Sequence, residues 1–280
     1  MRPWLLIGLA AFIVLFGIGV LITALPKRRA AAEQEACKYN LKNLSLFAAF
    51  YAHPPKNAPA EKLAQEVPAG TIFLPGIIPE DRLSWVVGAL AGVDQRQQNT
   101  TTLIGSLDDS RPWSAAKNQE AARLKVLALL CPGNPPSIDP EQPAPTQYVG
   151  IAGLGLDAAM LNFAAPGPAS PRAGCFRYDA PTPFTSIADG LSNTMLFGER
   201  SDDLGSWLRG GPATLRGLDD RPDAKPLLGL KAQFGGNHPE TSNWAMADGS
   251  TRSITPRVDR KVLFSLATIA GKETDPIPGE

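Results

Sequence analysis

The most apolar stretch of the chain lies at its N-terminal end. From Trp4 to Leu25 the sequence WLLIGLAAFIVLFGIGVLITAL has 22 residues and no charged side chain. A helix of that length rises about 33 Å, enough to cross the roughly 30 Å hydrocarbon core of a bilayer. The stretch is too long for the apolar core of a secretory signal, and the Pro-Lys-Arg-Arg that follows is a poor cleavage context. We therefore predict an uncleaved transmembrane anchor over residues 1–29, in contact with lipid through residues 4–25.

The next segment, residues 27–52, has the periodicity of an amphipathic helix. Its apolar positions recur at spacings of four and three, and they are Cys37, Leu41, Leu44, Ala48 and Tyr51. Such spacing places them on one helical face. Pro54 and Pro55 are expected to end the helix. We expect this face to pack on the body of the protein, with a kink at Pro26 between anchor and helix.

The body, residues 30–280, alternates short apolar segments with loops. Residues 82–92 read as helix or strand, and residues 114–130 as a helix that starts at Ser114 and continues through Lys125. Periodicity does not decide whether its end, VLALLCP, is helix or a short buried strand. QYVGIAG and the segment from Thr194 to Glu199 read as strands. These elements favour an α+β body that is rich in loops.

The clearest local signal is NWAMADGSTRSIT, residues 243–255, in which two strand-like runs flank Asp248 and Gly249. A two-residue Asp-Gly loop predicts a type I′ hairpin, because both central residues need positive φ. The last periodic segment, VDRKVLFSLATIAGKE, predicts a closing helix that stops at Gly271. Its shared face consists of Val262, Leu263, Leu266 and Ile269.

Composition excludes one class of partner and leaves the others open. The chain of 280 residues carries 27 basic and 27 acidic side chains, with no basic stripe, so nucleic acid is not an expected partner. The 26 glycines and 27 prolines indicate a folded body with many loops. There are three cysteines and no C-x-x-C pair, which argues against a zinc ribbon or a thioredoxin-like site.

Six segments in order give the chain a recognisable pattern. His238 is followed ten residues later by Asp248-Gly249, and ADGLSNTMLFGE spans residues 188–199. CKYNLKNLSLFAAFYAH, LLCPGNP, YVGIAG and VLFSLATIAGKE complete the set. From about Arg29 onward, the chain resembles the planctomycete family of pilin-like proteins with an H-x9-DG signature near the C-terminus.

The resemblance implies a fold and a location. The fold is pilin- or pseudopilin-like, with an N-terminal transmembrane helix that continues into a long amphipathic helix packed on an antiparallel sheet. The implied location is a single-pass protein of the inner (cytoplasmic) membrane with an extracytoplasmic body. The flanking charges alone, Arg2 against Lys27, Arg28 and Arg29, favour a cytoplasmic body, and we follow the resemblance. The apolar segment lacks the processing site and the internal Glu of pilins, so we expect a static, anchored relative.

His238 raises the question of catalysis, because Ser242 and Asp248 follow it closely. The three residue types suit a hydrolase triad, in which His activates Ser and Asp orients His. However, no G-x-S-x-G elbow is present, and the hairpin turn already accounts for Asp248. We therefore expect no enzymatic activity.

Metal binding is the second chemical possibility. Zinc needs three or four ligands, and His53 and His238 are the only two histidines. Calcium needs only carboxylates and loop carbonyls, and its candidate ligands are Asp189, Asn193 and Asp248. No EF-hand loop is present. A resident cofactor is not expected, and calcium is the alternative.

The interpretation that we favour is structural. The motif residues would frame loops and turns, and they are Asp189, Gly190, Ser192, Asn193, Thr194, Glu199, His238, Asp248 and Gly249. Glu199 would accept a hydrogen bond from His238 or from a backbone amide. Cys37 and Cys131 form either a disulfide between the helix and the body or a buried thiol pair.

Two classes of function remain. The first is a non-enzymatic structural or assembly protein of the cell envelope, which contacts envelope proteins or like subunits. The alternative is an anchored extracytoplasmic module that binds a solute or an ion in its loops. A binding module is expected to have a concave pocket lined by aromatic side chains, and aromatic residues make up only 7% of this chain.

Overall fold

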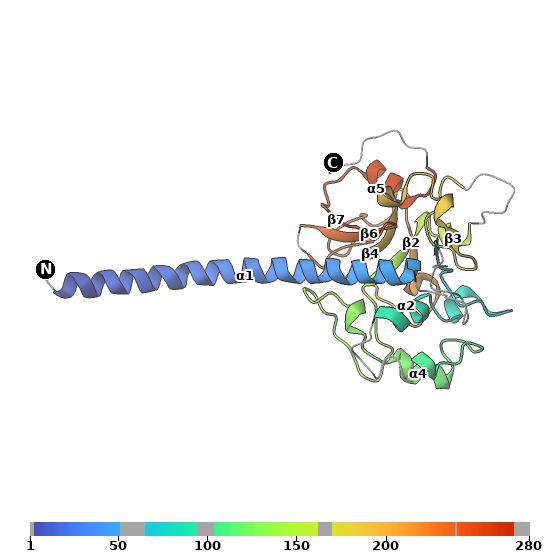
Figure 1. Ribbon diagram of the computed structural model, residues 1–280, viewed down its shortest axis with the longest axis horizontal. Coiled ribbons are helices and arrows are strands. Elements are labelled where there is room, and N and C mark those ends of the chain that lie inside the picture. The colour runs from blue at the N-terminus through green and yellow to red at the C-terminus, as the bar shows by residue number, and fades with distance from the viewer. Residues whose placement is uncertain (1–2, 51–64, 94–103, 162–169, 239, 272–280) are drawn as a thin grey trace.

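The protein consists of one long helix laid against a small α+β body (Figure 1). The computed structural model describes residues 3–50, 65–93, 104–161, 170–238 and 240–271. His53 and Tyr51 lie outside these ranges. The predicted α+β class with an N-terminal helix is confirmed.

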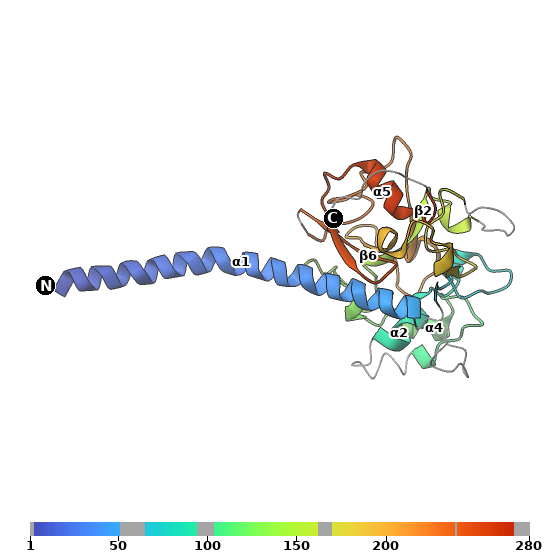
Figure 2. The same ribbon diagram turned by 45° about the horizontal axis from the view of Figure 1, so that its top comes forward.

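Helix α1, Pro3–Phe50, is 48 residues long. At 1.5 Å per residue it extends about 72 Å. Its C-terminal half lies along the body, whereas its N-terminal half projects away from the body in both views (Figures 1 and 2). Pro26 lies inside the helix, which is continuous through it. Figure 2 shows a gentle curve of the helix and no sharp kink. Within the described part of the chain, no helix is long and apolar enough to cross a membrane.

The stripe of α1 that faces the body is the one that the periodicity predicts. Cys37, Leu41 and Leu44 have no exposed surface and Ala48 has 1%. Lys42, one position beyond Leu41, is exposed. The C-terminal half of α1 is therefore an integral part of the core.

The main sheet has five strands in the order β5-β2-β4-β6-β7. Their bounds are β2 Tyr148–Leu154, β4 Met195–Glu199, β5 Leu215–Leu218, β6 Ser242–Met246 and β7 Thr251–Ile254. All neighbouring pairs are antiparallel except β2 and β5, which are parallel. The predicted antiparallel sheet is therefore mixed, because the chain crosses over from β4 to the far side of β2 before it returns to form β6. A second sheet pairs β1, Glu66–Val67, with β3, Thr182–Pro183.

The main sheet separates two apolar clusters, because successive strand residues point to opposite faces. On one face Leu41 and Leu44 of α1 belong to the same cluster as Leu196 and Ala245. The other face is covered by α5, Arg260–Ala267, whose Leu263 and Leu266 cluster with Met195 and Trp244. The two helices thus stabilise opposite faces of the same strands.

The remaining elements are short. The segment at residues 82–92 forms helix α2, Val86–Val93, which extends one residue beyond it, and residues 114–130 contain the seven-residue helix α4, Ala116–Ala122. The segment VLALLCP, for which helix and strand were both open, forms a 3-10 turn, Leu127–Leu129. Further 3-10 turns are Pro79–Asp81, Ala158–Met160, Phe184–Ser186, Leu191–Asn193 and Gly211–Ala213.

The hairpin between β6 and β7 is present, but its turn differs from the predicted type I′. Gly249 has φ +83°, whereas Asp248 is not among the described residues with positive φ. Gly249 N donates to Met246 O at 3.0 Å and Met246 N donates to Ser250 O at 2.8 Å. The loop is therefore a four-residue turn that closes on a left-handed glycine.

The closing helix α5 ends earlier than predicted, at Ala267 and not at Gly271.

If α1 is part of the core, truncating its buried face must destabilise the whole body. We expect Leu44→Ala to lower the free energy of unfolding by about 2–5 kcal/mol, because it removes a fully buried side chain. Urea unfolding of the full chain in detergent, followed by tryptophan fluorescence, measures this. The control, Lys42→Ala, lies on the exposed face and should change stability by less than about 0.5 kcal/mol. Equal effects of the two variants would contradict the packing described here.

Candidate functional site

The loop before β6 carries His238 to the end of β4. Gly235 and Gly236 have φ of +81° and +80°, and a Cβ on Gly236 would collide with Ser201. Glycine is needed here because it adopts this conformation without strain. Gly235 N donates to Glu199 O at 2.7 Å, and Asn237 Nδ2 donates to Arg200 O at 3.1 Å. These bonds hold the loop against the end of β4.

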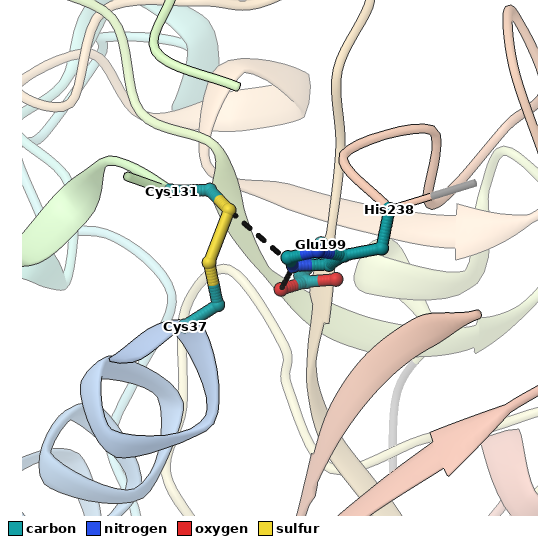
Figure 3. A group of neighbouring side chains, drawn as sticks. All are labelled: Cys37, Cys131, Glu199 and His238. Carbon is teal, nitrogen blue, oxygen red and sulfur yellow. Dashed lines mark hydrogen bonds and ion pairs between the residues drawn. A yellow bond between two sulfur atoms is a disulfide. The ribbon is translucent and has the colours of Figure 1, made fainter. Parts of the chain in front are cut away.

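Four side chains from distant parts of the sequence meet at this point (Figure 3). His238 Nε2 lies 3.5 Å from Cys131 Sγ and 3.6 Å from Glu199 Oε1. Cys131 is joined by a disulfide to Cys37 of α1, across a sequence separation of 94 residues. We call these four residues, Cys37, Cys131, Glu199 and His238, the cysteine-histidine cluster. It links α1, the loop after residue 130, strand β4 and the loop before β6.

The cysteine-histidine cluster is buried. Both cysteines and Glu199 have no exposed surface, and His238 is 9% exposed. A buried carboxylate is unfavourable unless it is paired and hydrogen-bonded. Glu199 accepts two hydrogen bonds from Asn243, one from its backbone N at 2.8 Å and one from Nδ2 at 3.1 Å. Burial raises the pKa of the neighbouring Tyr148, and the negative charge of Glu199 raises it further.

A network of amide side chains holds Cys131 in register with His238. Cys131 N donates to Gln147 Oε1 at 2.8 Å. Gln147 Nε2 donates to Asn134 O and to Asn237 Oδ1, both at 2.9 Å. Because Asn237 directly precedes His238, the CPGN loop and the histidine loop are fixed to each other through Gln147.

The two Asp-Gly turns lie next to each other, since Asp248 N donates to Leu191 O at 3.2 Å. Asp189 Oδ2 accepts from Gly271 N at 2.9 Å, and Asp248 Oδ1 accepts from Ser250 N at 2.9 Å and from Ser250 Oγ at 2.7 Å. The Asp248 carboxylate thus supports its own turn, whereas the Asp189 carboxylate ties its turn to the chain after α5.

The rest of the SNT segment completes the first turn. Asn193 Nδ2 donates to Asp189 O at 3.1 Å, and Thr194 Oγ1 donates to Gly190 O at 3.0 Å, while Ser192 is exposed. Gly190 has φ +90°, so glycine is needed at this turn too. Calcium binding by Asp189, Asn193 and Asp248 stays a prediction.

Among the described residues, His238, Ser242 and Asp248 are not joined by the hydrogen bonds of a catalytic triad. His238 Nε2 faces Glu199 and Cys131, and the carboxylate of Asp248 is bonded to Ser250. Ser242 Oγ is buried without a hydrogen-bond partner among the described atoms.

The cysteine-histidine cluster is placed to share a metal ion, because its ligand atoms lie within 4.8 Å of one another. In the described ranges it is the one such group of three or more His, Cys, Asp or Glu side chains. The sequence pointed separately to a Cys37–Cys131 pair and to a Glu199–His238 contact. That the two pairs meet was not predicted.

These observations define the class as a mixed α+β protein whose N-terminal helix is joined to its body by a disulfide. The chain belongs to the family described as "Protein of unknown function (DUF1559)", whose profile matches residues 26–219. The matched range contains Cys37, Cys131 and Glu199 and ends before His238. No curated protein and no solved structure matches the chain.

The disulfide predicts a definite thiol count. In protein taken from an oxidising compartment and denatured without reductant, we expect one free thiol per chain, that of the buried Cys175. Cys131→Ser should raise this count to two and lower the free energy of unfolding by about 2–4 kcal/mol, because the cross-link closes a long loop. The control, Cys175→Ala, should leave no free thiol. A count of three in the unmodified protein would show that the disulfide does not form.

Proposed function

We propose that the protein is a membrane-anchored, non-enzymatic structural or assembly protein of the cell envelope. In this proposal residues 4–25 lie in the inner (cytoplasmic) membrane, and the body is extracytoplasmic. The body then acts through contacts with envelope proteins or like subunits. The observation that carries the proposal is the projecting N-terminal half of α1.

The projecting half of α1 presents apolar side chains to its surroundings. Trp4 is 80% exposed, Leu15 69% and Ile22 66%, and no charged residue occurs between positions 4 and 25. Burying a large apolar side chain is worth about 1.5–3 kcal/mol, so leaving several of them in water is unfavourable. An apolar surface of this extent requires a partner. A bilayer suits it better than a protein groove, because the sequence from residue 4 to residue 25 places no charged residue on any side of the helix.

The pilin-like part of the proposal rests on the layout of the body. A long helix that is apolar at its start and packed at its end on a sheet is the arrangement that the resemblance implies. His238, Asp248 and Gly249, the residues of the H-x9-DG signature, lie beyond the range matched by the family profile. The absence of a Glu from residues 4–25 favours a static anchor over a filament subunit. A disulfide between helix and body agrees with an oxidising compartment outside the cytoplasm.

The anchor predicts where the full chain partitions. We expect the unmodified protein to stay with the membrane after washing with alkaline carbonate and to need detergent for extraction. The double substitution Ile13→Arg with Phe16→Arg should release it or prevent insertion, since each Arg costs about 2.5–3.5 kcal/mol near the centre of a membrane helix.

The matched control for this experiment is Tyr39→Arg, on the same helix but beside the body. Tyr39 is 62% exposed, and its substitution should leave the protein in the membrane. Recovery of the unmodified chain in the carbonate supernatant would refute the anchor. If the chain is retained, protease added to spheroplasts should digest the body, and protection of the body would reverse the proposed orientation.

A further inference from the structure

The geometry points to a second state of the cysteine-histidine cluster. We propose that when Cys37 and Cys131 are thiols, the cluster binds one Zn²⁺ through both sulfur atoms, His238 Nε2 and Glu199 Oε1. In this view the disulfide and the zinc ion are two alternative links between α1 and the body. The site is independent of whether the chain is membrane-anchored.

The distances in the cluster are close to those of a tetrahedral zinc site. With Zn–S near 2.3 Å and Zn–N or Zn–O near 2.0–2.1 Å, a tetrahedron has S···N edges of about 3.5 Å and N···O edges of about 3.3 Å. The structure has 3.5 Å from Cys131 Sγ to His238 Nε2 and 3.6 Å from His238 Nε2 to Glu199 Oε1. The two sulfur atoms must separate, from a covalent bond to about 3.8 Å. All the ligand atoms of the cluster lie within 4.8 Å of one another.

The donor set also suits zinc. Two thiolates and one imidazole are typical ligands of structural zinc sites, and a carboxylate is an accepted fourth ligand. Because the donors are buried, the site leaves little room for an additional water ligand, which is the mark of a structural site and not of a catalytic one.

The surroundings of the donors resemble the outer shell of a metal site. Glu199 is oriented by two hydrogen bonds from Asn243, and Ser253 Oγ in turn donates to Asn243 Oδ1 at 2.7 Å. Cys131 is positioned by Gln147 through its backbone N. Such secondary contacts hold ligands in place in metal sites.

A disulfide alone does not account for this arrangement. A cross-link between Cys37 and Cys131 needs no neighbouring charge, yet a fully buried carboxylate and an imidazole converge on it. Two apolar side chains would pack beside a disulfide with less desolvation. The presence of Glu199 and His238 within ligand distance is therefore the observation that points to an ion.

Exchange between the two states combines a two-electron reduction of the disulfide with uptake of the ion. A dithiol reductant supplies two electrons and two protons, so that the Cys37–Cys131 disulfide becomes two thiols while the dithiol becomes a disulfide. Zn²⁺ then displaces the two thiol protons and takes up the thiolates. In the reverse direction a disulfide oxidant takes two electrons from the two thiolates and two protons from water and becomes a dithiol, while the Cys37–Cys131 bond reforms and the ion is released.

The test uses the full chain in detergent. The disulfide is reduced with a water-soluble phosphine until three thiols per chain are counted, the phosphine is removed without oxygen, and Co²⁺ is added. We expect one equivalent of Co²⁺ to give thiolate charge-transfer bands and the visible bands of tetrahedral cobalt. One equivalent of Zn²⁺ should abolish both sets of bands. The oxidised protein should give neither.

Substitutions assign the ligands. Cys37→Ser and Cys131→Ser should each weaken the charge-transfer bands, and Glu199→Gln and His238→Ala should lower the affinity for Zn²⁺ at least tenfold. The control, Cys175→Ala, removes a thiol that is buried away from the cluster and should change nothing. Absence of the cobalt spectrum in the reduced unmodified chain would overturn the proposal, as would unchanged Zn²⁺ affinity in His238→Ala.

A second measurement uses the unmodified chain, so its result does not depend on whether a variant folds. In the reduced protein, Zn²⁺ should slow alkylation of Cys37 and Cys131 at least tenfold and leave the rate at Cys175 unchanged, as mapped by mass spectrometry. Equal rates for Cys37 and Cys131 with and without Zn²⁺ would count against a bound ion even if a cobalt spectrum were seen.

Discussion

The structure depends on the packing of the C-terminal half of α1 against the main sheet. Leu41 and Leu44 close one face of the strands, and without them the cluster that contains Leu196 and Ala245 would face water. The same helical face carries Cys37, so burial of the stripe also decides which helix turn lies beside Cys131. One apolar contact thus completes the core and assembles the only cross-link in the described part of the chain.

A second constraint is the burial of charge at the end of β4. Glu199 belongs to a strand, and its fixed backbone leaves its carboxylate no route to solvent. Hydrogen bonds from Asn243 and the approach of His238 offset the desolvation, so the strand β6 and the loop before it must be placed accurately. The two glycines at residues 235–236 and the hydrogen bonds of Gln147 hold the loop before β6 in that position.

Features that depend on local periodicity were predictable from the sequence. The stripe from Cys37 to Ala48 and the strands β2 and β4 follow from spacings within one segment. The type I′ turn was wrong because the dipeptide Asp248-Gly249 also fits a four-residue loop in which only Gly249 needs positive φ. The parallel pairing of β5 with β2 depends on a chain crossing that no local pattern records. The same holds for the meeting of the Cys37–Cys131 pair with Glu199 and His238.

The two proposals constrain each other through the redox state of the cysteines. A body outside the cytoplasm meets oxidising conditions, in which the disulfide is the stable link between α1 and the sheet. A body inside would keep Cys37 and Cys131 as thiols, and the proposed zinc ion would then be the link that joins them to Glu199 and His238. In either compartment the cluster ties α1 to the body near the midpoint of its packed half.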